Sequence, residues 1–434
     1  MMRLVRGLDA QLTAEWLGRD LVSLSLSPLH LLTGHSSGSV TLYRRRDSFS
    51  LVKKISRRVT SRDNLSVVSL APGLVCVGCR TGDVVLLHLS PVTVTVFSIQ
   101  ERVTALSVSS GTDIYVGGET GCVAVYSSQT RDTRQILDLG ASVVQIEVSG
   151  DTVVTSSTAT SVICNTKQRT FRQVGTKQSS GHPHGLSISG GHIWTSRPGA
   201  RFWQVDINTG EVLATVKYKQ VLDTLQPCQI IDEALEPPTF STSQEHSFSS
   251  LSTNDSGLAV TFNISGNIIY ILDLQQSRVV AWTPVTHLQI REAHIEGDLV
   301  LILGSRGELL SLRFGEILQL SRHCLHLGRE DLLLSLLTSA DGEDGGLTGH
   351  SQLDLAKLYL LCLRLHPSLT QMENEILKRL GGSAEFLSRS LPTQTSGPAS
   401  EEEDMNKARS VAAVVHLPYL VQIVHVQFQK IFRV

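Results

Sequence analysis

The segment LLTGHSSGSVTLY, residues 31–43, returns as VCVGCRTGDVVLL at 75–87 and as IYVGGETGCVAVY at 114–126. Each copy has two apolar residues, a variable position, a glycine, three variable positions, a second glycine, and then apolar residues in alternation. The first glycine of each copy follows the previous one after 44 and then 39 residues. A pattern that returns about every 40 residues indicates a repeated structural unit.

Four more copies continue the series with other residues in the glycine positions. They are VVTSSTATSVICN at 153–165, IWTSRPGARFWQV at 193–205, AVTFNISGNIIYI at 259–271 and VLILGSRGELLSL at 300–312. The first glycine is replaced in turn by Ser156, Ser196, Phe262 and Leu303, so the later steps are 39, 40, 66 and 41 residues. The one long step predicts an insertion at about 219–250, which we expect to be a mobile excursion.

Seven copies with strand alternation predict an all-β, seven-bladed, WD-like β-propeller over residues 1–313. The first small residue lets neighbouring strands approach, and the second glycine takes the left-handed conformation that a short hairpin needs. The Trp-Asp pair of typical WD repeats is replaced, for example by Tyr43-Arg44 and by Tyr126-Ser127. We therefore expect apolar packing, without the side-chain hydrogen-bond network of that family, to stabilise the blades.

Beyond the seventh copy the apolar period changes from two to 3.6 residues, which predicts a short, solenoid-like α-helical region at 314–391. One of its helices is apolar on nearly every side, and a helix of this kind must be covered by neighbours or by a partner. Its partner-binding candidates are Leu355, Leu358 and Tyr359. The composition of 392–409 predicts a disordered linker. The apolar segment at 410–434 contains histidines, glutamines and a proline, so we do not expect it to span a membrane.

The composition limits the class of partner and the cellular compartment. Lys and Arg number 38 against 40 Asp and Glu, so no net positive field would attract nucleic acid. The amino terminus has no apolar signal segment. The seven cysteines are odd in number and scattered, which favours reduced thiols in the cytosol over a disulfide framework.

Cysteine and histidine residues form no convincing catalytic or metal-binding motif. Cys76 and Cys79 make a C-x-x-C, but no second pair follows at zinc spacing and no helix start would activate a thiol. Two histidine groups also lack a further ligand at useful spacing; they are His182 with His184, and His323 with Cys324 and His326. No phosphate-binding loop, nucleophile elbow or carboxylate pair is present. The sequence therefore predicts no enzyme activity, no cofactor and no metal.

A cluster of basic residues falls on the expected outer strand and loops of the first blade. Its members are Arg44, Arg45, Arg46, Lys53, Lys54, Arg57 and Arg58, with Arg62 just beyond. One interpretation is a charged edge strand that avoids pairing with other chains. The other is a site for anionic lipid or an acidic partner.

The fifth copy contains SRPGARFWQVD, residues 196–206, with two arginines and two aromatic residues around a Pro-Gly pair. Pro198 and Gly199 predict a type II turn over 197–200. We expect Trp203 to pack within or beside the sheet. Arg197 and Arg201 then either stabilise the blade or contact a partner, so these two arginines and Trp203 are partner-binding candidates.

The same region carries a family resemblance. Residues 156–177 followed by 195–212 resemble the Hermansky-Pudlak syndrome protein 5 family, in which a small-polar strand, a Cys or aromatic residue, a Thr, a Phe and Gly-x-Lys precede Arg-Pro-Gly-x-Arg-x-Trp. The amino-terminal propeller of the tectonin-repeat autophagy protein is similar over this stretch. Family members are much longer, so the resemblance implies that this chain is a fragment or a truncated isoform.

The resemblance implies a non-catalytic scaffold or adaptor subunit of the second biogenesis-of-lysosome-related-organelles complex. Such a protein would be cytosolic, peripheral on endosomal membranes, and would serve melanosomes and dense granules. Its implied partners are subunits similar to Hermansky-Pudlak syndrome proteins 3 and 6, and a Rab-type small GTPase. Two alternatives stay open: a propeller that regulates autophagy, and a peripheral lipid-binding propeller that uses the basic cluster of the first blade.

Overall fold

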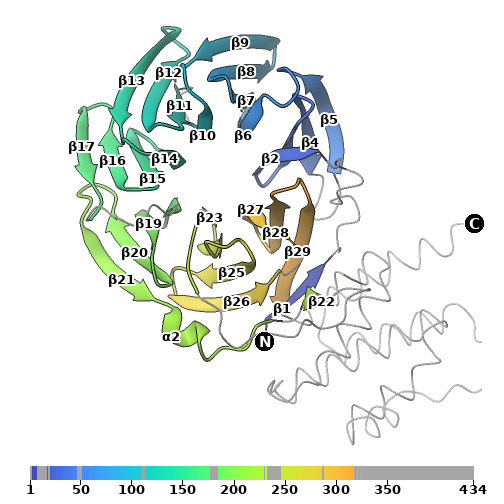
Figure 1. Cartoon of the computed structure of the whole chain (residues 1–434), viewed down its shortest axis with the longest axis vertical. Helices are drawn as coiled ribbons and strands as arrows, with labels where there is room; N and C mark the ends of the chain where they lie inside the picture. Colours follow the sequence, from blue (N-terminus) through green and yellow to red (C-terminus); the bar gives the residue numbers. More distant parts are fainter. Residues whose placement is uncertain are drawn as a thin grey trace, which may run out of the picture. The chain divides into compact units, whose positions relative to one another are not determined.

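The computed structural model describes residues 2–6, 17, 20–45, 51–109, 113–175, 184–228, 230–231, 246–285, 288–316, 320 and 324. Seven sheets are arranged in a ring, and in all but the last blade the first strand along the chain is innermost and the last strand is at the rim (Figure 1). The fold is therefore the seven-bladed, all-β propeller that the repeat spacing predicts.

The first four blades follow one another without interruption along the chain. Blade 1 contains β2 (Leu21–Leu26), β3 (His30–His35), β4 (Ser39–Arg45) and β5 (Leu51–Arg58). Blade 2 contains β6 (Leu65–Ala71), β7 (Leu74–Cys79), β8 (Asp83–Leu89) and β9 (Val92–Ser98). Blade 3 contains β10 (Val103–Val108), β11 (Asp113–Gly118), β12 (Cys122–Ser127) and β13 (Asp132–Asp138). Blade 4 contains β14 (Val143–Ser149), β15 (Thr152–Ser157), β16 (Ser161–Asn165) and β17 (Thr170–Gln173).

The remaining three blades include the insertion and the closure of the ring. Blade 5 contains β18 (Leu186–Ser189), β19 (His192–Arg197), β20 (Arg201–Asp206) and β21 (Val212–Lys217). Blade 6 contains β23 (Leu251–Thr253), β24 (Leu258–Phe262), β25 (Ile268–Asp273) and β26 (Arg278–Pro284). Blade 7 contains β27 (Ile290–Glu296), β28 (Leu299–Gly304) and β29 (Leu309–Glu316), joined by β1 (Met2–Arg6) and β22 (Ile230–Ile231).

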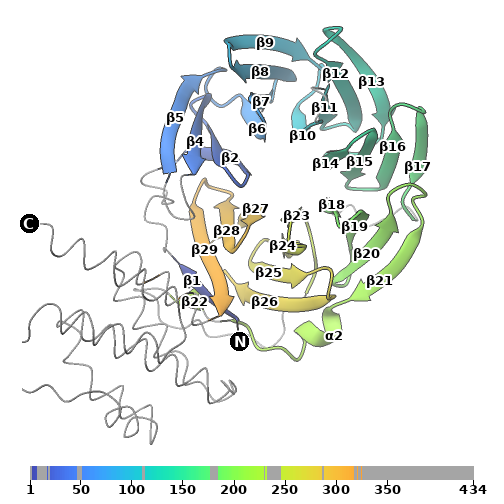
Figure 2. The same cartoon turned by 180° about the vertical axis from the view of Figure 1, so that it is seen from behind.

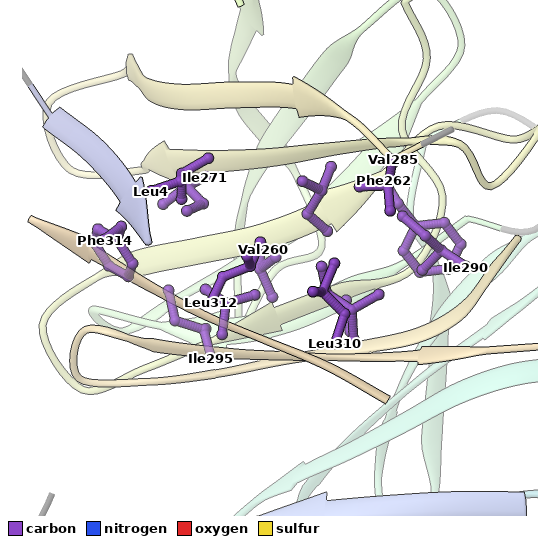
Figure 3. Close-up of a cluster of buried hydrophobic side chains, with 14 of the residues drawn as sticks. Leu4, Val260, Phe262, Ile271, Val285, Ile290, Ile295, Leu310, Leu312 and Phe314 are labelled. Atoms are coloured by element: carbon purple, nitrogen blue, oxygen red, sulfur yellow. The ribbon is translucent and has the colours of Figure 1, made fainter. Parts of the chain in front are cut away.

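The amino-terminal strand β1 completes the last blade. The strand order there is β22-β1-β29-β28-β27, and both views show β1 beside β29 at the rim (Figures 1 and 2). Leu4 of β1 is fully buried in an apolar cluster between blades 6 and 7, with Ile271 and Phe314 among its members (Figure 3). Burial of this side chain joins the start of the ring to its end.

The repeat positions are explained by the packing of neighbouring blades. Gly34 lies in β3, and a Cβ added there would lie 2.7 Å from Val68 of the next blade, so only a residue without a side chain fits. Gly38, four residues later, has φ +80° and donates its N–H to the His35 carbonyl at 2.9 Å, which closes the hairpin. In blade 6, where Phe262 stands in the first-glycine position, its ring belongs to the apolar cluster of Figure 3 instead.

Side-chain hydrogen bonds also connect the innermost strands of neighbouring blades. Ser66 Oγ donates to the Val103 carbonyl at 2.7 Å, and Thr104 Oγ1 donates to the Val143 carbonyl at 2.7 Å. The same serine and threonine also bond to carbonyls of their own blades. The expectation that apolar packing alone stabilises the blades is therefore wrong: short hydroxyl side chains connect them as well.

Part of the expected excursion between blades 5 and 6 has regular structure. Helix α2 (Lys219–Leu222) buries Leu222, and β22 pairs in parallel with β1 through Leu4↔Ile230. Residues 232–245 lie outside the described residues, and so do the candidates Leu355, Leu358 and Tyr359, the 392–409 linker and the 410–434 segment. Of the expected helical region beyond β29, the structure describes Leu320 and Cys324, both helical and buried.

Candidate functional site

The 196–206 hairpin has the positive φ at Gly199 that the Pro-Gly pair predicts, with one addition. Arg197 pairs with Arg201 across a three-residue loop that joins β19 to β20. Gly199 has φ +74°, as the third position of a type II turn requires. Ala200 has φ +50°, a second positive value that a type II turn alone does not need.

Arg197 is buried, with 1% of its surface exposed. Its guanidinium carbon lies 3.8 Å from the centre of the Trp203 ring, and Nη2 donates to the Val174 carbonyl at 3.4 Å. Among the residues that the structure describes, Nε and Nη1 have no hydrogen-bond partner. Burial, and then the charge of Arg201, lower the pKa of Arg197 to about 10. This side chain is therefore placed to pack blade 5, and a partner could not reach it without rearrangement.

Trp203 packs beside the sheet and fills space left by a glycine. A Cβ on Gly175 would lie 2.1 Å from the Trp203 ring, so the indole occupies the place of a side chain on the preceding blade. Arg201 is half-buried, and its Nε donates to the Pro198 carbonyl at 2.7 Å. Sequence reasoning grouped the three residues, and the structure separates a buried cation from two side chains that keep exposed surface.

The basic cluster lies mainly on β5, the outermost strand of blade 1 (Figure 1). Lys53, Lys54, Arg57 and Arg58 are exposed along it. Arg44 is exposed at the end of β4, and Arg45 donates Nη1 to the Ser27 carbonyl at 3.1 Å; Arg46 lies outside the described residues. Burial, and then the positive charges of Arg44 and Lys54, lower the pKa of His30. The cations thus produce a local positive field.

The next blade presents an outer strand of the opposite kind, which sequence reasoning missed. Strand β9 reads VTVTVFS and has no charged residue. Val92, Val94 and Val96 are 58%, 44% and 57% exposed. On the other face Phe97 stacks on Tyr126 of blade 3 at 4.3 Å. The signal in the sequence was the uncharged Val/Thr alternation at the fourth-strand position of a repeat.

Blade 1 contains an acid–histidine–hydroxyl series with the contacts of a catalytic triad. Asp20 Oδ1 lies 3.1 Å from His35 Nδ1, and His35 Nε2 lies 2.9 Å from Thr33 Oγ1. Thr33 is fully buried, and its hydroxyl donates to the Thr41 carbonyl of the neighbouring strand. Because no substrate can reach this hydroxyl, the series connects strands rather than forming a nucleophilic site.

A second polar group lies where the innermost strands of blades 4, 5 and 6 meet. Glu147 Oε2 accepts from the Ile188 N–H at 2.7 Å and from Ser187 Oγ at 3.1 Å. Gln145 donates to Glu147 and to the Leu251 carbonyl. Burial raises the pKa of Glu147 to about 7, although these hydrogen bonds oppose the shift. Glu147 and Gln145 together connect three blades, and among the described residues no second acid lies at hydrogen-bond distance from the carboxylate for paired acid–base chemistry.

The C-x-x-C cysteines lie in β7, where both are buried. Burial raises the pKa of the Cys76 thiol to about 12, which leaves it protonated and unreactive at neutral pH. Of the two histidine groups, His184 is buried, whereas His182, His323 and His326 lie outside the described residues. In the part of the chain that the structure describes, no three His, Cys, Asp or Glu residues are grouped as a metal site. The same part contains no helix that is long and apolar enough to cross a membrane.

These features define a class of protein, a WD-like propeller whose buried polar groups connect its own strands. A crystal structure of the RRP9 WD40 repeats has the same fold, with a TM-score of 0.51 at 12% identity over 72% of this chain and 97% of that chain. No protein-family model matches the chain.

Several curated proteins are similar to this chain in sequence. "BLOC-2 complex member HPS5" of Homo sapiens is 29% identical over 212 residues, 43% of this chain and 18% of that protein. The Drosophila melanogaster HPS5 homolog is 23% identical over 347 residues, 71% of this chain and 40% of that protein. "Tectonin beta-propeller repeat-containing protein 2" of Homo sapiens is 26% identical over 225 residues, 45% of this chain and 15% of that protein.

The chain is therefore distantly homologous to HPS5 over part of its length, and also to the tectonin protein. This confirms the resemblance drawn from residues 156–212. The matched region spans only 18% to 40% of these two HPS5 relatives.

Proposed function

We propose that this protein is a non-catalytic scaffold or adaptor subunit of a BLOC-2-type complex, which acts in endosomal trafficking and in the biogenesis of lysosome-related organelles. The observation that carries the proposal is the similarity to HPS5 from two distant animals, one of which matches 71% of this chain. The organelles that it would serve are melanosomes and dense granules, as the resemblance implies.

The chemistry of the propeller supports a binding role over a catalytic one. The acid–histidine–hydroxyl series around His35 ends at a fully buried hydroxyl, and Glu147 is occupied by hydrogen bonds between blades. Exposed basic and apolar residues gather instead at the rim, on β5 and β9. A rigid ring with a chemically distinct rim suits recognition of other proteins.

The proposed partners are subunits similar to Hermansky-Pudlak syndrome proteins 3 and 6, together with a Rab-type small GTPase. The proposed location is the cytosol, with peripheral attachment to endosomal membranes. Leu355, Leu358 and Tyr359, on the predicted all-round apolar helix, are the proposed contacts with those subunits, because such a helix needs a cover.

A second candidate function is regulation of autophagy. It is favoured by the 26% identity to the human tectonin protein over 225 residues. That match covers 45% of this chain, whereas the Drosophila HPS5 homolog matches 71%. The longer match makes the BLOC-2 assignment our first choice.

Affinity purification tests the assignment. The tagged full chain, expressed in pigment cells, should recover the other two BLOC-2 subunits, and Leu358→Asp should reduce that recovery. Leu29→Asp is the matched control, because Leu29 is 61% exposed and the same substitution there should leave recovery unchanged. Recovery of autophagy factors alone would favour the tectonin assignment, and recovery of neither set would contradict both.

A further inference from the structure

We propose that the rim of blades 1 and 2 is a docking surface for an extended acidic segment of a partner protein, which adds to β9 as a fifth strand. The surface consists of the exposed edge of β9 and of Arg57 on β5, and we call it the β5/β9 rim. This inference goes beyond the proposed function, because it specifies the chemistry of a bound segment and holds for any complex that contains the chain.

The first observation is that β9 has a free and regular edge. It pairs with β8 from Leu89↔Val92 to Asp83↔Ser98 without a register shift, and among the described residues no strand lies on its other side. A seven-residue strand with one free side presents a row of unpaired backbone N–H and C=O groups. Such a row is the template that an added strand uses.

The second observation is that β9 lacks the devices that protect edge strands. Charged residues and β-bulges normally prevent pairing at an exposed edge. The outer strands β5 and β13 have both, since each carries charged residues and a register shift against its neighbour. Strand β21 has a shift and Lys217, and β17 is four residues long with Arg172 in it. Among the described outer strands, β9 alone combines full length, regular register and no charge.

The third observation is that the outer edges of blades 6 and 7 are occupied by added segments of the chain. In blade 7 the edge of β29 is covered by β1, and β22 adds in parallel beyond it. In blade 6 the Cys228 N–H donates to the Trp282 carbonyl at 2.7 Å, and the Trp282 indole donates to the Leu225 carbonyl at 2.9 Å. A blade edge of this propeller therefore accepts an added extended segment, and β22 is an example.

The valine side chains of β9 show which face an added strand would use. Val94 pairs with Leu87 and Val96 pairs with Val85, and paired residues project to the same face of a sheet. Leu87 and Val85 belong to the apolar cluster between blades 1 and 2. The exposed valine stripe therefore lies on the side of β9 that faces blade 1.

One cation of β5, Arg57, lies on the facing side of blade 1, whereas Lys53 pairs with Tyr43 of the apolar cluster between blades 7 and 1. Arg57 pairs with Val40, which belongs to the same cluster between the blades, so Arg57 projects toward blade 2. Arg57 is exposed and makes no ion pair in the described part of the chain. A segment lying on the valine stripe would thus meet a positive field.

These observations together define the occupant. Backbone pairing with β9 requires an extended segment, in which alternate residues project to the same face. The residues on the face toward blade 1 meet both the valine stripe and Arg57, so that face favours aliphatic residues together with Asp or Glu. An anionic lipid surface would use the cations but has no use for a free strand edge. A second copy of the chain would offer an edge that has no acidic residue.

A binding assay with synthetic peptides tests the proposal. The probe is a fluorescein-labelled seven-residue peptide in which Val and Glu take turns at the odd positions, which share one face of an extended strand, and Thr occupies the even positions. The controls are the same peptide with Lys for Glu and with Pro at its centre. The purified full chain should bind the Glu peptide, with affinity that falls as salt rises, and neither control. Hydrogen exchange should slow in β9 when the Glu peptide is present.

Single substitutions separate the two parts of the β5/β9 rim. Val94→Lys should weaken Glu-peptide binding by about tenfold or more, and so should Arg57→Glu. Val212→Lys, at a 38% exposed valine of outer strand β21, is the matched control and should bind as the unmodified chain does.

Three outcomes would overturn the proposal: equal binding by Val94→Lys, unchanged exchange in β9, or Arg57-dependent binding to phosphatidylserine vesicles with no peptide binding. The last would make the rim a membrane-binding surface. Because the assay uses only this chain and synthetic peptides, its failure leaves the BLOC-2 assignment to be judged by co-purification.

Discussion

Blades 7 and 2 differ in whether another strand covers their outer edge. The last strand of blade 7, β29, is covered by β1 and then by β22, and Leu4 of β1 is fully buried. The last strand of blade 2, β9, is uncovered among the described residues and exposes three valines. The same sheet geometry thus serves closure of the ring at one place and leaves a free edge at another.

This difference indicates which edge contributes to the stability of the ring and which edge is available for recognition. An edge covered by its own chain removes apolar surface and backbone groups from water, which contributes to folding. An uncovered edge contributes little to folding and keeps those groups available for another chain. The comparison therefore predicts large losses of stability from changes at β1, and small ones from changes at β9.

Leu4→Asp should produce the largest effect, because it breaks the covered edge. It removes a fully buried side chain from the cluster of Figure 3 and puts a carboxylate among apolar residues. We expect a loss of about 4 kcal/mol in the free energy of unfolding, measured by urea denaturation. Leu29→Asp, at an exposed leucine, should change it by less than about 0.5 kcal/mol. An equally small effect of Leu4→Asp would show that β1 does not close the ring.

The innermost strands, in contrast to the two outer edges, are connected by polar side chains such as Glu147. The contribution of Glu147 to the stability of the fold should depend on pH. Its pKa is raised by burial from 4.5 to about 7, so the folded state binds a proton more tightly than the unfolded state. Between these two pH values the free energy of unfolding should fall as pH rises. The upper limit of this fall is about 3 kcal/mol, and the actual fall should be smaller because the side chain is half-buried.

Glu147→Gln tests this, since it keeps the hydrogen-bond acceptor for Ile188 and removes the titration. The variant should lose the fall in stability between pH 4.5 and 7 and should be the more stable form at pH 8. Urea denaturation at a series of pH values provides the measurement. Parallel pH profiles for the two proteins would rule out Glu147 as the cause.

Substitutions in the blade 5 hairpin should have an effect on stability between those at the covered and at the uncovered edge. Gly199→Val should lower the free energy of unfolding by about 1–2 kcal/mol, because a β-branched residue resists φ +74°. Apart from the two neighbouring residues of the chain, Arg201 Nε is the only atom of the described residues within 4 Å of the added Cβ, so the cost is conformational rather than steric. Gly199→Asn should cost less, since asparagine tolerates this region. Equal losses from both substitutions would contradict the conformational explanation.

The number of blades could be predicted from the sequence because it depends on local geometry. Gly38 is needed by its own hairpin and Gly34 by the side chain that follows in the next blade, so both recur with the blade period. Where Phe262 or Leu303 replaces the first glycine of the repeat, the position still keeps its place in the strand alternation. Strand period and turn chemistry were sufficient here.

The burial of Arg197 could not be predicted, because it depends on residues that lie far away in the sequence or on another blade. Its partners are the Val174 carbonyl and the Trp203 ring, which itself needs the space above Gly175. An arginine next to a turn has the same sequence signature whether it is exposed or covered. The free edge of β9 was missed for a related reason, since whether a strand is covered depends on the path of the rest of the chain.

Val94→Lys should have the smallest effect on stability, and it tests most directly whether the edges of blades 7 and 2 differ. Val94 is 44% exposed on the last strand of blade 2, so a lysine can extend into water from the same position without leaving a cavity. We expect the urea midpoint to correspond to a change of less than about 0.5 kcal/mol. A lysine at an exposed edge is also a device by which sheets avoid pairing, so the variant should aggregate no more than the unmodified chain. A loss near that of Leu4→Asp would mean that β9 is covered in the folded protein, and the contrast between the two edges would then disappear.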